Sequence, residues 1–293
     1  MEIVIQVLQV VTPVFLVVAT GALWAKSGRE FPIDFVTQLA TKLAVPALII
    51  VVLMQSELDE QAVSSMIGAS FVAYGAAMAL FAGVLLALAL PRRVYLAPMT
   101  FGNTGNLGLP LALFAFGEAG LELAIVVFAV TSILVFSLGI ALVSGSFAMR
   151  RLISEPIFCG TVIGTTLLYT GLETPIWATN FLELIGQLAI PLVLITLGVS
   201  LARLNGSNFV RAGVLSLMKI TLCAAIGWTV AQMFGLSDLQ RAVLILQLAT
   251  PVAVTSYMLA QLYGSEPQEV ATLVIASTGL SVLTLPILLS LLL

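Results

Sequence analysis

The sequence has no histidine, two cysteines and few charged side chains, and each shortage excludes a class of function. Without histidine, the commonest general base and zinc ligand is missing. Cys159 and Cys223 both stand inside apolar runs, so we interpret them as small core residues and expect no disulfide or metal site. A formal net charge of −3 offers no basic surface to a nucleic acid. No cofactor and no nucleic-acid partner are therefore expected.

Long apolar runs are what the sequence has in excess. Hydrophobic residues make up 60% of the 293 residues and charged residues 9%, whereas soluble domains average about half and a quarter. Because one membrane span takes about 20 residues, most of the chain is expected inside a lipid bilayer. The runs, broken at charged residues and at Gly, Pro and Asn clusters, predict ten spans at residues 3–24, 34–55, 66–90, 94–117, 120–144, 153–172, 178–202, 210–234, 238–262 and 268–293.

Basic residues predict the orientation of these spans, because they are retained on the cytoplasmic side in short loops. Only Arg241 falls on one side of the predicted membrane, where acidic residues cluster. The opposite side carries Lys26, Arg29, Arg92, Arg93, Arg150, Arg151, Arg203 and Arg211. Both termini should therefore lie outside. The first run has no basic segment before it, so we expect a permanent span and not a cleaved signal peptide.

The two halves of the chain resemble each other in three segments that follow the same order. Each match contains Pro or Gly: residues 13–21 with 156–164, 42–46 with 187–191, and 116–124 with 263–271. They predict a first repeat at residues 1–148 and a second at 149–293. Five spans per repeat is an odd number, so the second repeat enters the membrane from the opposite side. Inverted repeats are typical of secondary transporters.

Helix-breaking residues gather at the centres of the fourth and ninth predicted spans. Residues 102–110 read GNTGNLGLP, and Pro251 interrupts the ninth span at a similar depth. A broken helix at mid-membrane is tolerated where protein or a water-filled cavity surrounds it. The residues predicted to break the helices or act as hinges are Gly105, Gly108, Pro110 and Pro251. The residues predicted to bind substrate are Asn103, Thr104, Asn106, Gln247 and Thr250, with Thr131 of the fifth span added from the resemblance below.

Two crossing broken helices bring half-helix N-termini together, and their partial positive charge favours an anion. No Asp or Glu lies near either break, which argues against a carboxylate-based sodium or proton site; backbone carbonyls remain as alternative sodium ligands. Small polar residues also serve to pack membrane helices, and Thr131 can bond its own helix. Lys42 and Lys219 are expected to extend toward the cytoplasmic surface and not to contact substrate.

The sequence is similar to the auxin efflux carrier family, which contains the plant PIN carriers and many bacterial relatives. The likeness rests on GNTGNLGLPL at Gly102–Leu111 and IGQLAIPLVLITLGVSL at Ile185–Leu201. It implies a scaffold of spans 1, 2, 6 and 7 that forms a homodimer, and a core of spans 3–5 and 8–10 that moves as an elevator. By similarity Asn103 and Thr131 face the substrate. Thr250-Pro251 replaces the Asn-Pro of plant members, which argues against auxin itself as the substrate but not against transport.

These observations predict an all-α carrier in a bacterial inner membrane, with periplasmic termini, that exports a small organic anion such as a carboxylate. A sodium-coupled organic-anion symporter of the bile acid type is the first alternative. A membrane-embedded enzyme is a remote alternative, because the sequence has no histidine and no central carboxylate. A Ser/Lys pair such as Ser216 and Lys219, three residues apart, is formally possible. A sensor that keeps the carrier fold without moving solute is another.

Overall fold

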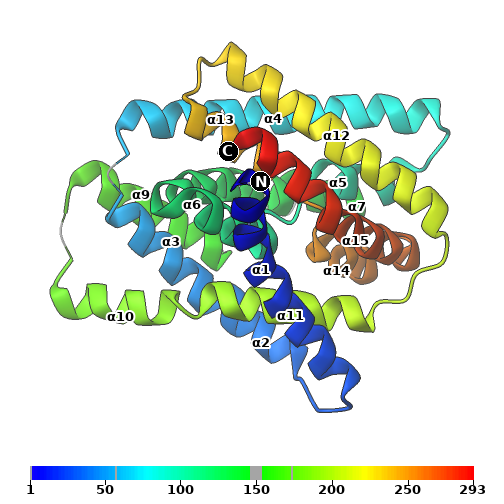
Figure 1. The fold of residues 1–293 in the computed structure, drawn as a ribbon, viewed down its shortest axis with the longest axis horizontal. Helices are drawn as coiled ribbons and strands as arrows, with labels where there is room; N and C mark the ends of the chain where they lie inside the picture. The colour runs from blue at the N-terminus through cyan, green and yellow to red at the C-terminus, as the bar shows by residue number, and fades with distance from the viewer. Residues whose placement is uncertain (1, 57, 146–153, 173) are drawn as a thin grey trace.

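The fold is helical throughout the part that this computed structural model describes, residues 2–56, 58–145, 154–172 and 174–293 (Figure 1). Arg150 and Arg151, which contribute to the predicted orientation, lie outside the described residues. The first half contains α1 (Glu2–Lys26), α2 (Ile33–Leu39), η1 (Ala40–Ala44), α3 (Val45–Met54), α4 (Glu60–Ala87), α5 (Arg92–Thr100), η2 (Thr104–Gly108), α6 (Leu109–Leu134), η3 (Val135–Gly139) and α7 (Ile140–Ser144). The second half contains α9 (Pro156–Thr170), α10 (Ile176–Gly186), α11 (Ala189–Arg203), α12 (Phe209–Met233), α13 (Asp238–Leu248), α14 (Val254–Tyr263) and α15 (Pro267–Leu292).

Several of these helices have the length and apolar character of membrane spans. Within the described residues, seven segments qualify: Ile5–Lys26, Ile33–Met54, Glu60–Ala87, Thr104–Ser144, Ile176–Arg203, Phe209–Met233 and Pro267–Leu292. The segment Pro156–Thr170 is apolar but shorter. The longest segment has 41 residues and is divided at Gly117, whose φ of 68° and ψ of −161° are not helical. Because α7 packs beside α5, the chain turns back after Gly117, and the molecule is polytopic.

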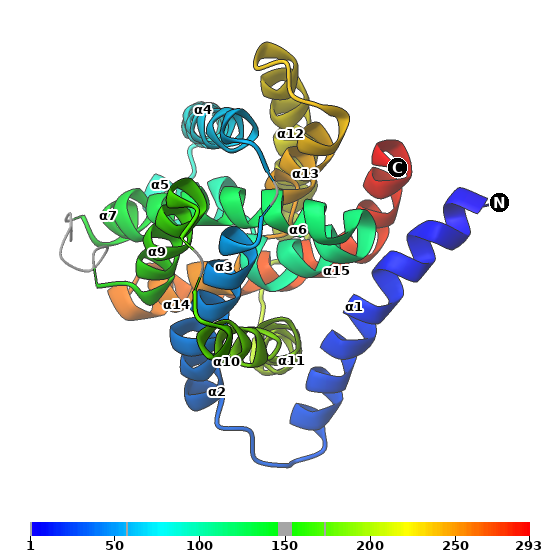
Figure 2. The same ribbon diagram turned by 90° about the vertical axis from the view of Figure 1, so that its left-hand side faces the viewer.

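The helices pack in two groups. In one group α1 crosses α11, while α3 packs against α9 and α10. In the other, α12 contacts α13 and α15, and α4 contacts α5 and α6. Figure 2 shows α4 and α10 nearly end-on, with α1 slanting along the edge of the molecule. Contacts between α6 and both α1 and α9 connect the groups.

The ends of the helices form two faces of opposite charge. In Figure 1 the α4–α5, α11–α12 and α14–α15 connections lie on the right, and the α3–α4 and α12–α13 connections lie on the left. We call the right side the basic face, because Arg92, Arg93, Arg203 and Arg211 belong to its helix ends. We call the left side the acidic face, after Asp59, Glu60 and Asp238. These two names are used below.

Candidate substrate site

Two helices are interrupted inside the molecule, and the interruptions touch. After α5 ends, the backbone is extended at Phe101, with φ −98° and ψ 122°, before η2 begins at Thr104. Residues 249–253 separate α13 from α14 in the same way. Gly102 and Val252 form an isolated antiparallel β-bridge. The Asn103 backbone N–H donates to the Pro251 carbonyl oxygen at 2.7 Å, so the two breaks are joined by their backbones. We call this contact between residues 101–103 and 249–253 the crossing.

Glycine is required where the breaks come closest. A Cβ on Gly102 would lie 2.2 Å from Thr250 Oγ1, far inside van der Waals contact. A Cβ on Gly108 would lie 2.2 Å from Gln247 Oε1. Thr250 Oγ1 in turn donates to the Gln247 carbonyl oxygen at 2.6 Å, which ties down the last turn of α13. The crossing thus depends on glycines in the segment from α5 to α6 and on local hydrogen bonds at the end of α13.

The crossing exposes helix N-termini to a cavity. The first turn of a helix has N–H groups without partners in the helix, and both η2 and α14 begin beside the crossing. The Asn103 carbonyl oxygen accepts the N–H groups of Leu107 and Gly108, both at 3.1 Å. The Asn103 side chain is 4% exposed, and its Nδ2 has no hydrogen-bond partner among the described residues. Asn103 therefore offers a buried donor at the cavity wall.

This cavity has a volume of about 240 Å³ and combines polar and apolar walls. Its polar lining includes Asn103, Thr104, Asn106, Thr131, Ser132 and Thr255. Its apolar lining includes Phe128, Val135, Phe136, Met258 and Leu259. A neighbouring cavity of about 270 Å³ shares Asn106, Thr37 and Thr41 with it and continues to Asp34 and Arg203 at the basic face. We call the two together the crossing cavity.

The predicted site residues fall into two sets. Those that line the crossing cavity are Asn103, Thr104, Gly105, Asn106 and Thr131. Those buried behind the crossing, where they do not line it, are Gly108, Pro110, Gln247, Thr250 and Pro251. The Thr131 hydroxyl donates to the Val127 carbonyl oxygen of its own helix at 2.8 Å. Gln247 is fully buried, and its amide atoms have no hydrogen-bond partner among the described residues.

The expectation that Lys219 extends to the membrane surface is wrong. Its side chain is 0% exposed, and its Nζ donates to the Thr250 carbonyl oxygen at 2.7 Å and to the Leu248 carbonyl oxygen at 3.4 Å. The side chain is directed to the end of α13, where the last carbonyl groups of a helix attract a cation. Lys42, in contrast, is exposed and lies 3.4 Å from Gln38 Oε1.

Several residues of the cavity could not be recognised from the sequence. Thr37 and Thr41 come from α2 and η1, Phe128 and Ser132 from α6, and Glu155 directly precedes α9. None stands in an unusual local pattern, and only the packing of the two groups of helices brings them to the crossing. Burial raises the pKa of the half-buried Glu155 carboxyl, and the Lys42 ammonium partly opposes this rise.

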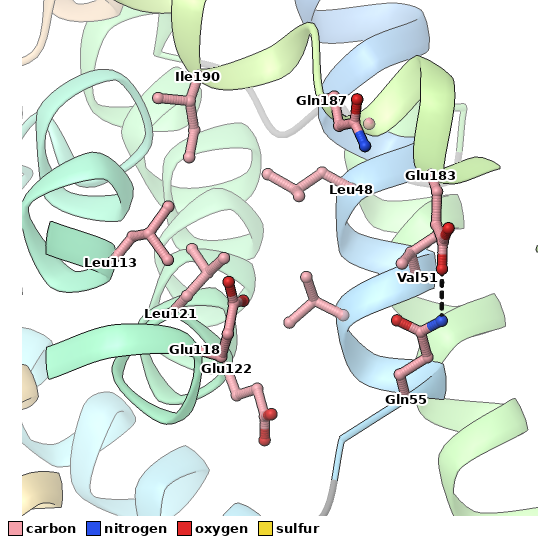
Figure 3. Close-up of a pocket in the computed structure, with 12 residues that line it drawn as sticks. Leu48, Val51, Gln55, Leu113, Glu118, Leu121, Glu122, Glu183, Gln187 and Ile190 are labelled. Atoms are coloured by element: carbon pink, nitrogen blue, oxygen red, sulfur yellow. Dashed lines mark hydrogen bonds between the residues drawn. The ribbon is translucent and has the colours of Figure 1, made fainter. Parts of the chain in front are cut away.

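A second cavity, of about 570 Å³, lies toward the acidic face (Figure 3). Its walls are α3, the middle of α6, and the α10–α11 junction, which contribute Val51, Leu113 and Gln187. Glu118 and Glu122 stand on one side of it. On the other side the Gln55 amide donates to Glu183 Oε1 at 2.7 Å. We call it the acidic cavity.

A polytopic helical protein whose interrupted helices meet in its interior has the architecture of a secondary membrane transporter. A protein-family model described as "Membrane transport protein" matches residues 6–147 and 140–289 of the chain. The chain therefore belongs to this family of membrane transporters, the auxin efflux carrier family, as its sequence motifs predict. A comparison with curated proteins finds no significant match.

Proposed function

We propose that this transporter exports a small organic anion, a carboxylate of auxin-like or malonate-like chemistry, by binding it in the crossing cavity. The observation that carries the proposal is the unpartnered amide nitrogen of Asn103, buried at the cavity wall beside two helix N-termini. A carboxylate would satisfy this donor and the first-turn N–H groups together. Asn103, Thr104 and Asn106 would contact the substrate, and Thr131 and Ser132 would line its far side.

The charges around the crossing favour an anion over a cation. Lys219 places a buried ammonium directly behind the bridge, whereas the crossing residues that line the cavity are neutral. Two acidic groups line the crossing cavity, Glu155 in one part and Asp34 in the other, and burial raises the pKa of the Glu155 carboxyl. Phe128, Met258 and Leu259 provide apolar contact for the organic part of the substrate. These features support an organic acid in preference to an inorganic ion.

We further propose that transport follows alternating access of the elevator type. In this proposal ten spans form two inverted repeats, with spans 1, 2, 6 and 7 as a dimeric scaffold and the others as a moving core. Support comes from the two groups of packed helices and from cavities between these groups at opposite ends. Thr41 lines the crossing cavity and Leu48 lines the acidic cavity. The helical segment between these two residues is about 10 Å long at about 1.5 Å per residue. That stretch would be the barrier that the core carries the substrate past.

The proposed orientation places the basic face in the cytoplasm of a bacterium and both termini in the periplasm. The crossing cavity then opens inward, as a carrier ready to load its export substrate requires. An inside-negative potential of 100 mV supplies about 2.3 kcal/mol per anion, so export would need no coupled ion. Catalysis is not part of the proposal, because Ser216 and Lys219 are both fully buried and Lys219 is engaged by backbone carbonyls.

The test is uptake of labelled malonate or indole acetate into inside-out vesicles that contain the purified protein. Asn103→Ala and Pro251→Ala are compared with wild type, and Asn180→Ala, on an exposed position of α10, serves as the matched control. Loss of a hydrogen bond to a charged group costs about 1.5–3 kcal/mol, so Asn103→Ala should lower the initial rate at subsaturating substrate about tenfold or more. Unchanged uptake in both site variants would refute the site. Uptake that requires sodium would favour the symporter alternative.

A further inference from the structure

Among the residues that the structure describes, no carboxylate forms an ion pair with the fully buried side chain of Lys219. The ion pairs of the described residues are Arg211–Glu269 and Arg241–Asp238; Lys219 is in neither. Its acceptors are the backbone carbonyl oxygens of Leu248 and Thr250. A buried charge without hydrogen-bonded compensation is too costly to persist. The carbonyl groups at the end of α13 are the compensation that the described residues offer to a charge on Lys219.

These carbonyl groups have the chemistry of a site for a small monovalent cation. They are hard oxygen ligands at a helix C-terminus, where the helix dipole adds partial negative charge. The helix ends there because Thr250 and Pro251 interrupt it. Unwound carbonyls and half-helix C-termini hold sodium ions in other secondary transporters. Here the ammonium of Lys219 already fills the position.

The ammonium also lies next to the crossing cavity. A Cβ on Gly102 would be 3.4 Å from Lys219 Nζ, and Gly102 itself lines the cavity. Only the backbone of the crossing separates the positive charge from a bound substrate. The break in the ninth predicted span therefore offers two different helix ends. The C-terminus of α13 holds the lysine side chain, and the N-terminus of α14 is left for an anion.

We propose that Lys219 is a tethered cation, which permanently occupies a carbonyl site that would otherwise take a free monovalent cation. Its charge holds the α13–α14 break in place and attracts the anionic substrate across the Gly102 backbone; this second role rests on the proposed function. Lys219 is a positioning residue, since it contacts the break and not the substrate. Wild-type stability and transport are accordingly indifferent to sodium.

The experiment is thermal unfolding of purified variants in sodium, ethylammonium or choline chloride at equal ionic strength. Lys219→Ala and Lys219→Ser empty the site, whereas Lys219→Met fills it without charge. Lys42→Ala removes an exposed lysine and is the matched control. Sodium or ethylammonium should raise the melting temperature of the Ala and Ser variants in a saturable way, because a ligand stabilises only the state that binds it. Wild type, Lys219→Met and Lys42→Ala should show no such response.

Each outcome decides the proposal. The proposal is overturned if the melting temperatures of Lys219→Ala and Lys219→Ser do not change with the cation. It is also overturned if these two variants fail to fold in every salt while Lys219→Met folds. An equal cation response in Lys219→Met would also overturn it, since the filled site has no room for an ion. Binding of organic acids is measured separately, and we expect at least about tenfold weaker binding in Lys219→Met. If wild type binds no acid, the proposed function fails, while the cation response of Lys219→Ala still tests the tethered cation.

Discussion

At the scale of residues, the crossing itself is built from neutral donors, and charged groups lie behind it or farther along the cavity wall. Asn103 and Thr104 present polar groups at the crossing, Lys219 stands behind the backbone, and Glu155 stands at the cavity wall near α9. In the proposed function, the backbone N–H groups would select an anion, and the surrounding charges would adjust how tightly it binds. Substitutions of single residues should therefore separate binding from folding.

Gly102 should tolerate no side chain. In Gly102→Ala the new Cβ would be 2.2 Å from Thr250 Oγ1 and 3.0 Å from the Thr250 carbonyl oxygen. Overpacking of this kind costs about 1–3 kcal/mol, so the melting temperature should fall and substrate binding should be lost. Gly75→Ala, where a Cβ meets nothing within 4 Å, is the control. Equal melting temperatures for the two variants would show that the crossing is looser than described.

Glu155 should make anion binding depend on pH. Its pKa is raised by burial, against the opposing effect of Lys42, so the carboxyl becomes neutral as the pH falls through that raised value. Anion binding should strengthen over the same interval, because a negative charge leaves the cavity wall. Glu155→Gln should bind tightly at all these pH values. Isothermal titration with an acid that stays ionised throughout measures this, and an unchanged pH profile in Glu155→Gln would contradict it.

At the scale of helices, the two breaks and the close contact of α1 with α11 determine how the helices pack. A Cβ on Gly198 would lie 1.9 Å from the Val18 carbonyl oxygen, and one on Gly21 would lie 2.1 Å from that of Ile195. Small residues of this kind let membrane helices approach closely. The two helices belong to the group proposed as the scaffold.

Gly198→Ala should destabilise the α1–α11 contact, and Gly198 itself does not line the crossing cavity. The helices would separate or tilt, so we expect a lower melting temperature, with any binding that remains at the wild-type dissociation constant. Gly213→Ala, at a position on α12 with nothing within 4 Å of the new Cβ, should leave the melting temperature unchanged or raise it. A dissociation constant that changes in Gly198→Ala alone would mean that the α1–α11 contact also shapes the cavity.

The sequence predicts the breaks better than it predicts their surroundings. Pro251 lies in the α13–α14 break, as predicted, whereas Gly105 and Gly108, predicted to break the fourth span, lie in η2. Pro110 lies in the first turn of α6, and the break itself comes earlier, at residues 101–103. The predicted direction of the Lys219 side chain is wrong, because its acceptors lie at the end of α13, a different segment of the chain. Thr37 and Phe128 reach the cavity only through packing between distant helices. Local signals therefore identified the crossing, while tertiary contacts completed the site.

At the scale of the whole molecule, two cavities approach the middle of the protein from opposite faces. Asn106 belongs to the crossing cavity and Glu118 to the acidic cavity. A carrier that alternates between two states should open one of them fully at a time. The account therefore predicts different access from the two sides of the membrane.

Thiol labelling can measure this access. In a Cys159→Ser background, which removes an exposed thiol, a charged membrane-impermeant reagent should modify Asn106→Cys in inside-out vesicles and Glu118→Cys in right-side-out vesicles. Saturating organic acid should slow the first reaction, because Asn106 then lies beneath the substrate. Labelling of Asn106→Cys only from right-side-out vesicles would reverse the proposed orientation.

The central claim is that the crossing binds an anion, and equilibrium binding of a labelled organic acid to the purified protein tests it most directly. Asn103→Asp keeps the size of the side chain but replaces its donor with a negative charge. The account predicts saturable binding to wild type that is displaced by other carboxylates, and at least about a hundredfold weaker binding to Asn103→Asp. Equal binding to both proteins would contradict it.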